Sequence, residues 1–514
     1  MRAGAAVVDI GPPPGLPMLG FVRRQTGATG SGLPLEATAL VLEEGATRVV
    51  LCGVDTLGIP SPDVDRLRER LAAAAGADPA GVLLNWNHTH CAPPATPGLL
   101  ARSGLLAADR ADGVEAYSQL LFDRLEELVR GAVARLEPAG VAWGVGEVDL
   151  SVNRRERAPS GEIVHGWRVD GLVDRQVVAL RAARPDGTAI ATLVGYGCHT
   201  VSVGMDVTTY SADFPGPLRD RIRAWTGGEC VFFQGAAGNI LPRISFGPDE
   251  GEAHRMGERL AVEAVHCLAD RDPWPKRLVR EMDGSLIPMI LFRYEDEPAA
   301  SVELRAAEAR LELPLRALPS VDELTALSAE YDAAVADAES RGAGDAERYG
   351  LLFHAKWARL ALAEVSAGTA ATTVAGSVHA VRIGDGVIVT APGEPFTELG
   401  LAVKGRSPGR PTLYAGYTNG AVGYFPTAAA YEEGGYEPVY SNRSYGQPAP
   451  VEPECERILV ETGVRLAESL FPEREPFAGD DWSAHGTPPA LPVEPVAPPP
   501  AGVFAPPRTA KQPG

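Results

Sequence analysis

Three consecutive segments, TRVVLCGVD (47–55), PDVDRLRERLAAAAG (62–76) and GVLLNWN (81–87), decide the fold class. The first and third are short apolar runs rich in β-branched residues, which predicts strands. The middle segment carries Asp in its first turn and ends in Gly, as expected of a helix. Strand, helix and strand within about forty residues form a βαβ unit. We therefore expect an α/β protein whose ligands bind at the carboxyl ends of strands.

The rest of the chain continues this mixed pattern. Strands are predicted over 5–10, 36–44, 141–150, 175–183, 188–197, 230–235 and 373–390, and helices over 113–136, 214–225, 251–270 and 451–471. Residues 319–367 predict a helical pair with little strand character, which we interpret as an insertion on the main domain. We expect residues 1–475 to form one domain with a mixed β-sheet core and flanking helices.

The composition changes near residue 476. Eleven of the last 39 residues are Pro, and such a segment cannot build a packed core. We predict a disordered, solvated tail over 476–514, with an SH3-type ligand role as the alternative.

Charge and composition exclude several classes of protein. The 514 residues carry a net charge of −20 and no Lys/Arg run longer than a pair, which argues against a nucleic-acid partner. The longest apolar runs are too short to cross a bilayer, and the N-terminus does not resemble a signal peptide. The six Cys show neither a CxxC pair nor regular spacing, so we expect a cytoplasmic protein without a disulfide framework.

Polar residues follow three of the apolar strands. His88 and His90 lie in NHTHC, and because residues i and i+2 of an extended segment face the same side, both imidazoles can reach one site. His199 lies in GYGCHT, and Glu394 lies in the turn APGEPF at the start of a helix. Each has a structural alternative: two polar loop histidines, one structural histidine, and a carboxylate that only stabilises a helix N-terminus.

Taken together, these residues match a known kind of metal site. Two His and one Glu are the ligands of many catalytic zinc sites, with water in the open position. Zinc lowers the pKa of that water to about 7 and so produces hydroxide at neutral pH. Three strand ends that each offer one suitable ligand are more specific than any one of them.

The motifs also occur in a recognisable order. The chain opens with VVDIGPPPGLPMLGF (7–21) and continues with NHTHCAPP (87–94), YGCHT (196–200), YSADFPG (210–216), FFQGAAGNILP (232–242), APGEPFTELG (391–400), GYTNGAVGYFPT (416–427) and AAYEEGGYE (429–437). From about residue 4 to 471, this order resembles the neutral/alkaline ceramidase family. The resemblance implies a zinc-dependent amidohydrolase that cleaves the amide of an N-acylated amine, a small or lipid-like substrate.

The resemblance also implies roles for individual residues. The zinc ligands would be the side chains at four positions, His88, His199, Glu394 and Tyr424. His90 and Arg154 would be catalytic: either would stabilise the oxyanion, and His90 is the best candidate for the general acid. Asn153 and Asp213 would contact the polar part of the substrate.

One position departs from the family pattern. Leu241 stands where the family has a Ser that is assigned a catalytic role, and it supplies no hydroxyl. Either zinc-bound water attacks directly, or the chemistry differs. The N-terminus, which does not resemble a signal peptide, and the Pro-rich tail in place of the family's C-terminal β-domain separately favour a substrate other than ceramide. Two alternatives remain open: a catalytically inactive ceramidase-like binding protein, and a hydrolase that uses Cys91 as its nucleophile.

Overall fold

The predicted βαβ unit is present. In the computed structural model, which describes residues 1–102, 111–282, 289–297 and 301–474, β4 (Thr47–Val54) leads through α1 (Ser61–Ala75) and the 3₁₀ turn η1 (Pro79–Gly81) into β5 (Val82–Trp86). β4 and β5 are adjacent and parallel. The predicted tail over 476–514 lies outside the described residues.

Three larger sheets form the body of the protein. The first has the order β5-β4-β3-β1-β6, with β1 (Arg2–Asp9), β3 (Glu36–Glu44) and β6 (Glu137–Pro138). The second has the order β13-β11-β10-β7, with β7 (Gly140–Glu147), β10 (Gln176–Ala183), β11 (Ala189–Tyr196) and β13 (Glu229–Gln234). The third has the order β17-β18-β19-β21, with β17 (Leu304–Pro314), β18 (Thr373–Ile383), β19 (Gly386–Thr390) and β21 (Thr412–Ala415).

Each larger sheet contains one parallel pair among antiparallel neighbours. These pairs are β4 with β5, β11 with β13, and β19 with β21. The mixed α/β architecture expected from the sequence is therefore confirmed. The strand β17 was not anticipated, since LRAAEARLELP contains many good helix formers. It is extended because it pairs with β18 along its whole length.

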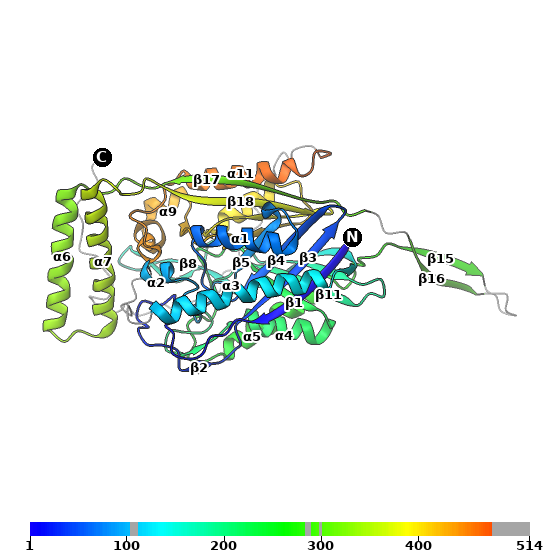
Figure 1. The fold of residues 1–514 in the computed structure, drawn as a ribbon, viewed down its shortest axis with the longest axis horizontal. Coiled ribbons are helices and arrows are strands. Elements are labelled where there is room, and N and C mark those ends of the chain that lie inside the picture. Colours follow the sequence, from blue (N-terminus) through cyan, green and yellow to red (C-terminus); the bar gives the residue numbers. More distant parts are fainter. Residues whose placement is uncertain (103–110, 283–288, 298–300, 475–514) are drawn as a thin grey trace.

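Smaller sheets connect the larger ones. They comprise β2 (Gly30–Ser31) with β12 (Thr209–Tyr210), β20 (Glu394–Pro395) with β22 (Tyr424–Phe425), and β14 (Ile240–Pro242) with β8 (Ser151–Arg157) and β9 (Ile163–Arg168). A hairpin of β15 (Lys276–Met282) and β16 (Ile290–Asp296) projects from the body (Figure 1).

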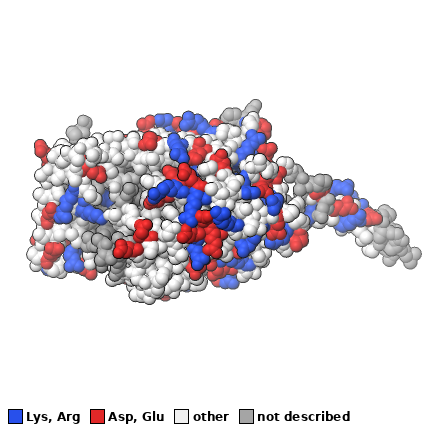
Figure 2. All heavy atoms as spheres, viewed as in Figure 1, with Lys and Arg blue, Asp and Glu red and all other residues white. Residues whose placement is uncertain are grey.

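Helices cover the sheets on the outside. They are α2 (Pro97–Arg102), α3 (Ala111–Ala134), α4 (Pro215–Thr226), α5 (Gly251–His266), α8 (Thr397–Arg406), α9 (Ala428–Glu433), α10 (Tyr436–Val439) and α11 (Cys455–Ser469). The predicted helical pair corresponds to α6 (Val321–Ser340) and α7 (Asp345–Ala367), which stand side by side at one end of the molecule (Figure 1). Figure 2 shows Lys and Arg interspersed with Asp and Glu on the face drawn.

The inner faces of the three larger sheets share one apolar core. Leu51 of β4, Leu193 of β11 and Ile388 of β19 belong to the same fully buried cluster. Gly53 allows the first two sheets to approach, because a Cβ there would lie 2.6 Å from the carbonyl oxygen of Phe232. The sheets are therefore packed so closely that the carboxyl ends of their parallel strands meet.

The side chain of Asn85 joins these strand ends. Its Nδ2 donates to the carbonyl oxygens of Gly416 at 2.8 Å and Gln234 at 3.2 Å, and its Oδ1 accepts from the backbone N–H of Gln234 at 2.6 Å. β5, β13 and the segment after β21 are thus linked through one buried amide. Gln234 extends the link, because its Nε2 donates to the carbonyl oxygen of Cys198 at 2.6 Å.

We expect Asn85→Leu to be strongly destabilising. It leaves buried backbone groups unpaired, and each costs about 1–3 kcal/mol. Gln119→Leu, on the exposed face of α3, is the control because it also replaces an amide by Leu. We expect it to change the free energy of unfolding by no more than about 0.5 kcal/mol. Chemical denaturation followed by circular dichroism measures both. Equal unfolding free energies for the two variants would contradict the role given to Asn85.

Candidate metal centre

Strand ends bring four polar side chains to one point. His88 follows β5, His199 follows β11, and Glu394 in β20 follows β19. Tyr424 in β22 pairs with Glu394 in a short parallel ladder. These are the four residues that the resemblance implies as zinc ligands, and all are buried, with exposed fractions of 3%, 1%, 2% and 7% in that order.

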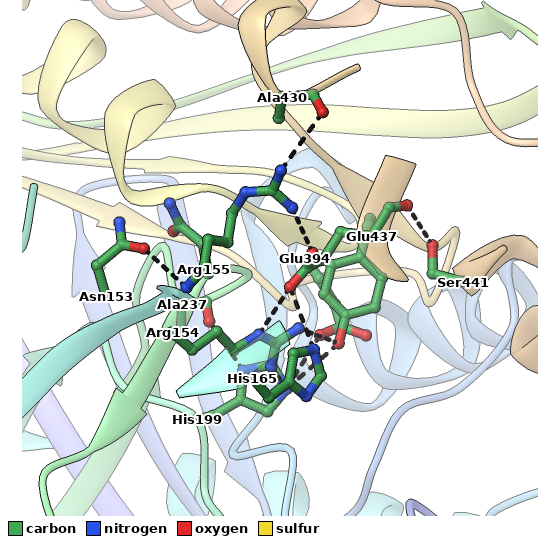
Figure 3. Close-up of polar contacts among 12 residues, drawn as sticks. Asn153, Arg154, Arg155, His165, His199, Ala237, Glu394, Ala430, Glu437 and Ser441 are labelled. Carbon is green, nitrogen blue, oxygen red and sulfur yellow. Dashed lines mark hydrogen bonds and ion pairs between the residues drawn. The ribbon is translucent and has the colours of Figure 1, made fainter. Parts of the chain in front are cut away.

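The polar atoms of these residues lie within contact of one another. The Oε2 atom of Glu394 is 3.4 Å from His88 Nε2 and 3.3 Å from His199 Nε2. The hydroxyl of Tyr424 is 3.4 Å from His199 Nε2. Figure 3 shows the His199 ring and the Glu394 carboxylate facing each other beside Arg154.

Backbone carbonyls fix the tautomer of both imidazoles. His88 Nδ1 lies 2.8 Å from the carbonyl oxygen of Leu57, and His199 Nδ1 lies 2.8 Å from that of Ala237. A carbonyl oxygen only accepts, so each Nδ1 carries the proton and donates. Burial, then Arg154 and His88, lower the pKa of His199 well below its ordinary value. Its Nε2 therefore presents a lone pair to the centre, the orientation typical of a metal-bound His.

The donor set fits a metal ion. Two Nε2 lone pairs and a carboxylate oxygen converge, and acceptors in such contact repel one another unless a cation lies between them. Ligands at 2.0–2.1 Å from one tetrahedral zinc ion are separated by about 3.3–3.4 Å. The separations of Glu394 Oε2 from His88 Nε2 and His199 Nε2, at 3.4 and 3.3 Å, match this value.

His90 provides a third imidazole at the same place. A nitrogen of each of His88, His90 and His199 lies within 4.8 Å of the others, so this group could hold a metal ion. Both ring nitrogens of His90 are buried and have no hydrogen-bond partner among the residues that the structure describes. Burial, followed by His88, lowers the pKa of His90 well below its ordinary value. The ring packs edge-on against Phe21, with centroids 4.9 Å apart.

Two tyrosines that the sequence analysis did not assign hold the carboxylate of Glu394. Tyr417 donates to Oε2 at 3.2 Å, and Tyr445 donates to Oε1 in a short hydrogen bond. Tyr417 lies within the quoted motif GYTNGAVGYFPT, as Tyr424 does. Nothing in the sequence shows which of the two tyrosines is the metal ligand and which one donates to Glu394. Tyr445 lies outside every motif quoted.

A buried ion pair places Arg154 beside the centre. Its Nε donates to Glu437 Oε1 at 2.8 Å, and one terminal nitrogen donates to the Tyr424 hydroxyl at 3.1 Å. The other terminal nitrogen is 3.5 Å from His199 Nε2. Burial opposes the charged guanidinium, yet Tyr424 and Glu437 raise the pKa of Arg154. The cation therefore points into the site with its charge intact.

Glu437 is the third residue that the sequence analysis missed. It is 1% exposed and pairs with Arg154 and with Arg155, whose terminal nitrogen is 2.6 Å from Oε2. Burial alone would raise the pKa of Glu437, but Arg154, His165 and Arg155 hold it below its usual range. His165, to which the sequence analysis gave no role, has its Nε2 3.5 Å from Glu437 Oε1 (Figure 3). The signal was present, since Glu437 ends the quoted motif AAYEEGGYE.

A pocket opens above the centre. His88, His90 and Glu394 are at its base, and its walls are mostly apolar or aromatic, formed by Leu19, Phe21, Val22, Leu57, Leu99, Tyr424, Tyr436 and Tyr445. Its empty space, including the open mouth, is about 560 Å³. A polar base under apolar walls is the usual arrangement of a small-molecule site.

Comparison with known proteins establishes what this architecture is. No protein-family model matches the sequence, and no curated protein matches it. A solved structure of the neutral ceramidase from Pseudomonas aeruginosa matches at 19% identity with a TM-score of 0.62, over 94% of this chain and 77% of that one. A ceramidase complexed with C2 matches at 18% identity with a TM-score of 0.63, over 93% and 77%. The protein has a neutral ceramidase-like fold.

Two of the residues proposed to bind substrate make other contacts in this ceramidase-like fold. The side chain of Asn153 donates to the carbonyl oxygen of Leu172 at 3.1 Å and accepts from the backbone N–H of Arg155 at 3.2 Å. The Asp213 carboxylate accepts from the backbone N–H groups of Val203 at 2.8 Å and Phe214 at 2.6 Å. Among the described residues, these contacts hold loops and do not reach the metal centre.

Leu241 and five of the six cysteines are also buried, and Cys267 is partly exposed. Leu241 lies in β14, is 3% exposed and is not among the residues that line the pocket described above. All six Cys lie in the described part of the chain as free thiols. Burial raises the pKa of Cys91 to about 11 and that of Cys198 well above its ordinary value. Both thiols are therefore protonated near neutral pH, which argues against Cys91 as nucleophile.

Among the described helices, none is long and apolar enough to cross a membrane.

We expect the purified protein to bind close to one equivalent of zinc. His88→Ala and Glu394→Gln should each weaken zinc binding by at least about 100-fold. Each removes a proposed ligand, and even the loss of a hydrogen-bond partner of a ligand weakens metal binding by about 10- to 100-fold. His254→Ala and Glu432→Gln, at exposed positions, are the matched controls. Chelator competition with elemental analysis measures the affinity. Unchanged zinc content in the two ligand variants would show that the ion binds elsewhere.

Proposed function

We propose that the protein is a zinc-dependent amidohydrolase that cleaves the amide bond of an N-acylated amine. The observation that carries this proposal is the convergence of His88 Nε2, His199 Nε2 and Glu394 Oε2 beneath an apolar pocket, with the Arg154 cation beside them. The fold shared with solved ceramidases supports it. His88, His199, Glu394 and Tyr424 would hold the zinc ion.

The chain supplies its own stabilisation for the charge that develops in amide hydrolysis. Bound zinc polarises a carbonyl and makes water nucleophilic at neutral pH. Arg154 and Tyr424 lie side by side at the centre, because the guanidinium donates to the Tyr424 hydroxyl and both groups lie within 3.5 Å of His199 Nε2. Donors placed where an oxyanion forms contribute about 3–4 kcal/mol each in other hydrolases. The Glu437 carboxylate holds Arg154 in this position.

His90 is suited to transfer the proton. Hydrolysis adds water to the carbonyl carbon, breaks the C–N bond, and requires a proton to reach the departing nitrogen. The ring of His90 lies beside His88, with centroids 5.2 Å apart, and neither of its nitrogens is engaged elsewhere among the described residues. We infer that it accepts a proton from the attacking water and delivers it to the amine.

The pocket walls favour a substrate with an apolar acyl group. Leu19, Phe21, Val22, Leu57 and Leu99 line the pocket, and Tyr436 and Tyr445 add aromatic surface to it. Ceramide is one such N-acylated amine, and shorter amides are others. A cytoplasmic location and the lack of a nucleic-acid partner remain predictions from composition.

A catalytically inactive binding protein is the alternative. Its support is Leu241, which lacks a hydroxyl. The four proposed zinc ligands and Arg154 are nevertheless brought together, which favours an active enzyme that does not need a Ser at this position.

The test is a screen of N-acyl amines, from short-chain amides to ceramide, with the zinc-loaded protein. We expect release of free amine and carboxylic acid from at least one substrate with an apolar acyl chain, detected by mass spectrometry. His88→Ala is the blank. Stoichiometric zinc without hydrolysis of any member would favour the binding protein.

Gly20 offers a direct test of His90. A Cβ at Gly20 would lie 2.3 Å from His90 Cγ, so Gly20→Ala must displace the imidazole or the pocket wall. Gly161→Ala is the matched control, since its φ of 90° resembles the 99° of Gly20 but no atom of the described residues beyond its chain neighbours lies within 4 Å of the new Cβ. We expect kcat/KM to fall about 100-fold more for Gly20→Ala, as for a catalytic group misplaced by about 1 Å. Equal losses would exclude a catalytic role for His90.

A further inference from the structure

One short segment touches both the metal centre and the helical pair. This segment, the strap, comprises residues 441–448: the 3₁₀ helix η3 (Ser441–Tyr445) and the three residues after it. The strap links the metal centre to α6 and α7, which stand at one end of the molecule and are not part of the three larger sheets (Figure 1).

On its inner side, the strap contacts the proposed ligand Glu394. The Tyr445 hydroxyl donates to Glu394 Oε1. Gln447 Nε2 donates to the carbonyl oxygen of Val422. The next residue, Gly423, accepts from the backbone N–H of Glu394 at 2.8 Å. The strap therefore supports both the side chain and the backbone of Glu394.

On its outer side, the strap is attached to α6 and α7 through Arg443. A terminal nitrogen of Arg443 donates to His354 Nδ1 at 2.5 Å and to the Tyr331 hydroxyl at 3.3 Å. The guanidinium carbon lies 3.9 Å from the ring centroid of Trp357. Trp357 Nε1 in turn donates to the carbonyl oxygen of Pro448 at 2.9 Å. The helical pair thus holds the strap at Arg443 and at Pro448.

Arg443 is an unusual residue for a purely structural contact. Among the described residues it has no acidic partner within ion-pair distance, and its Nε is buried without a hydrogen-bond partner. Burial lowers the pKa of Arg443. Burial, then Arg443, also lowers the pKa of His354 to about 3, so this ring remains a neutral acceptor. The Arg443 guanidinium is held by aromatic rings and one imidazole, so its position depends on how α6 and α7 place those rings.

We propose that the helical pair α6–α7 positions Tyr445 against Glu394 by binding the side chain of Arg443, and that this contact sets the zinc affinity of the centre. Arg443 is a positioning residue: it contacts no ligand and acts through Tyr445. This inference rests on the proposed function, because it assumes that the centre binds zinc. Arg443 and the helical pair have no role in the quoted motifs or in the proposed ligand set.

The experiment is a double-mutant cycle on zinc affinity in the full chain. Tyr445→Phe removes the hydrogen bond to Glu394, and Arg443→Met removes the attachment while keeping much of the side-chain length. We expect each to raise the zinc Kd about 10-fold, the lower end of the effect of losing a partner of a metal ligand. The double variant should match Tyr445→Phe alone, because Arg443 then has no hydrogen bond left to position.

Arg359→Met is the matched control. Arg359 of α7 pairs with Asp332 of α6 at 2.5 Å, is 57% exposed at its side chain, and has no described contact with the strap. Its zinc Kd should equal that of the wild type. If Arg443→Met leaves the zinc Kd unchanged, or if the two effects multiply in the double variant, the proposal is wrong.

Hydrogen exchange separates this inference from the proposed function. Arg443→Met should speed amide exchange in the strap and around Glu394, and Arg359→Met should not. If the wild type binds no zinc, the proposed function fails, and exchange alone then decides the positioning: faster exchange confined to Arg443→Met supports it, and identical patterns in both variants overturn it.

Discussion

The structure depends on one buried amide. Asn85 links the end of β5, the end of β13 and the segment after β21 through hydrogen bonds of 2.6–3.2 Å. Close packing of three sheets brings these strand ends together, and their backbone groups need partners because water is excluded. The loop after β5 carries His88, and β11 and β19, which pair in parallel with β13 and β21, lead into His199 and Glu394. The amide that satisfies the core therefore also helps to align the candidate metal centre.

The centre is built from groups that are unfavourable without a cation. A buried carboxylate faces the lone pairs of His88 and His199, whose outer nitrogens are occupied by backbone carbonyls. Around it, opposite charges are paired: Glu437 with Arg154 and Arg155. The tyrosine hydroxyls of Tyr417 and Tyr445 complete the hydrogen bonds of Glu394. Partners of this kind fix the orientation of metal ligands, which is the physical basis of the influence proposed for the helical pair that contacts the strap.

Much of the fold and part of the site could be predicted from the sequence. The βαβ unit has clear apolar runs and helix ends, and residues at strand ends are constrained to one edge of a sheet. Tyr445 lies outside every quoted motif and Glu437 ends one, yet neither could be given a role, because the role of a phenol or a carboxylate depends on partners distant in sequence. Asp213 shows the converse: it lies in the quoted motif YSADFPG, but its carboxylate accepts hydrogen bonds from the backbone N–H groups of Val203 and Phe214. β17 was missed because pairing with β18 overrides its local helix preference.

By itself, the sequence determined the alternation of strands and helices, the strand ends that carry His88, His199 and Glu394, and the resemblance to ceramidases. These follow from local patterns of apolar and polar residues. Only the tertiary structure decided which nitrogens and oxygens face one another, that Arg154 points inward, and that the strap joins Glu394 to α6 and α7. The physical reason is that hydrogen bonds and charge pairs act over about 3–4 Å, so their partners are set by how the sheets and helices pack rather than by spacing along the chain.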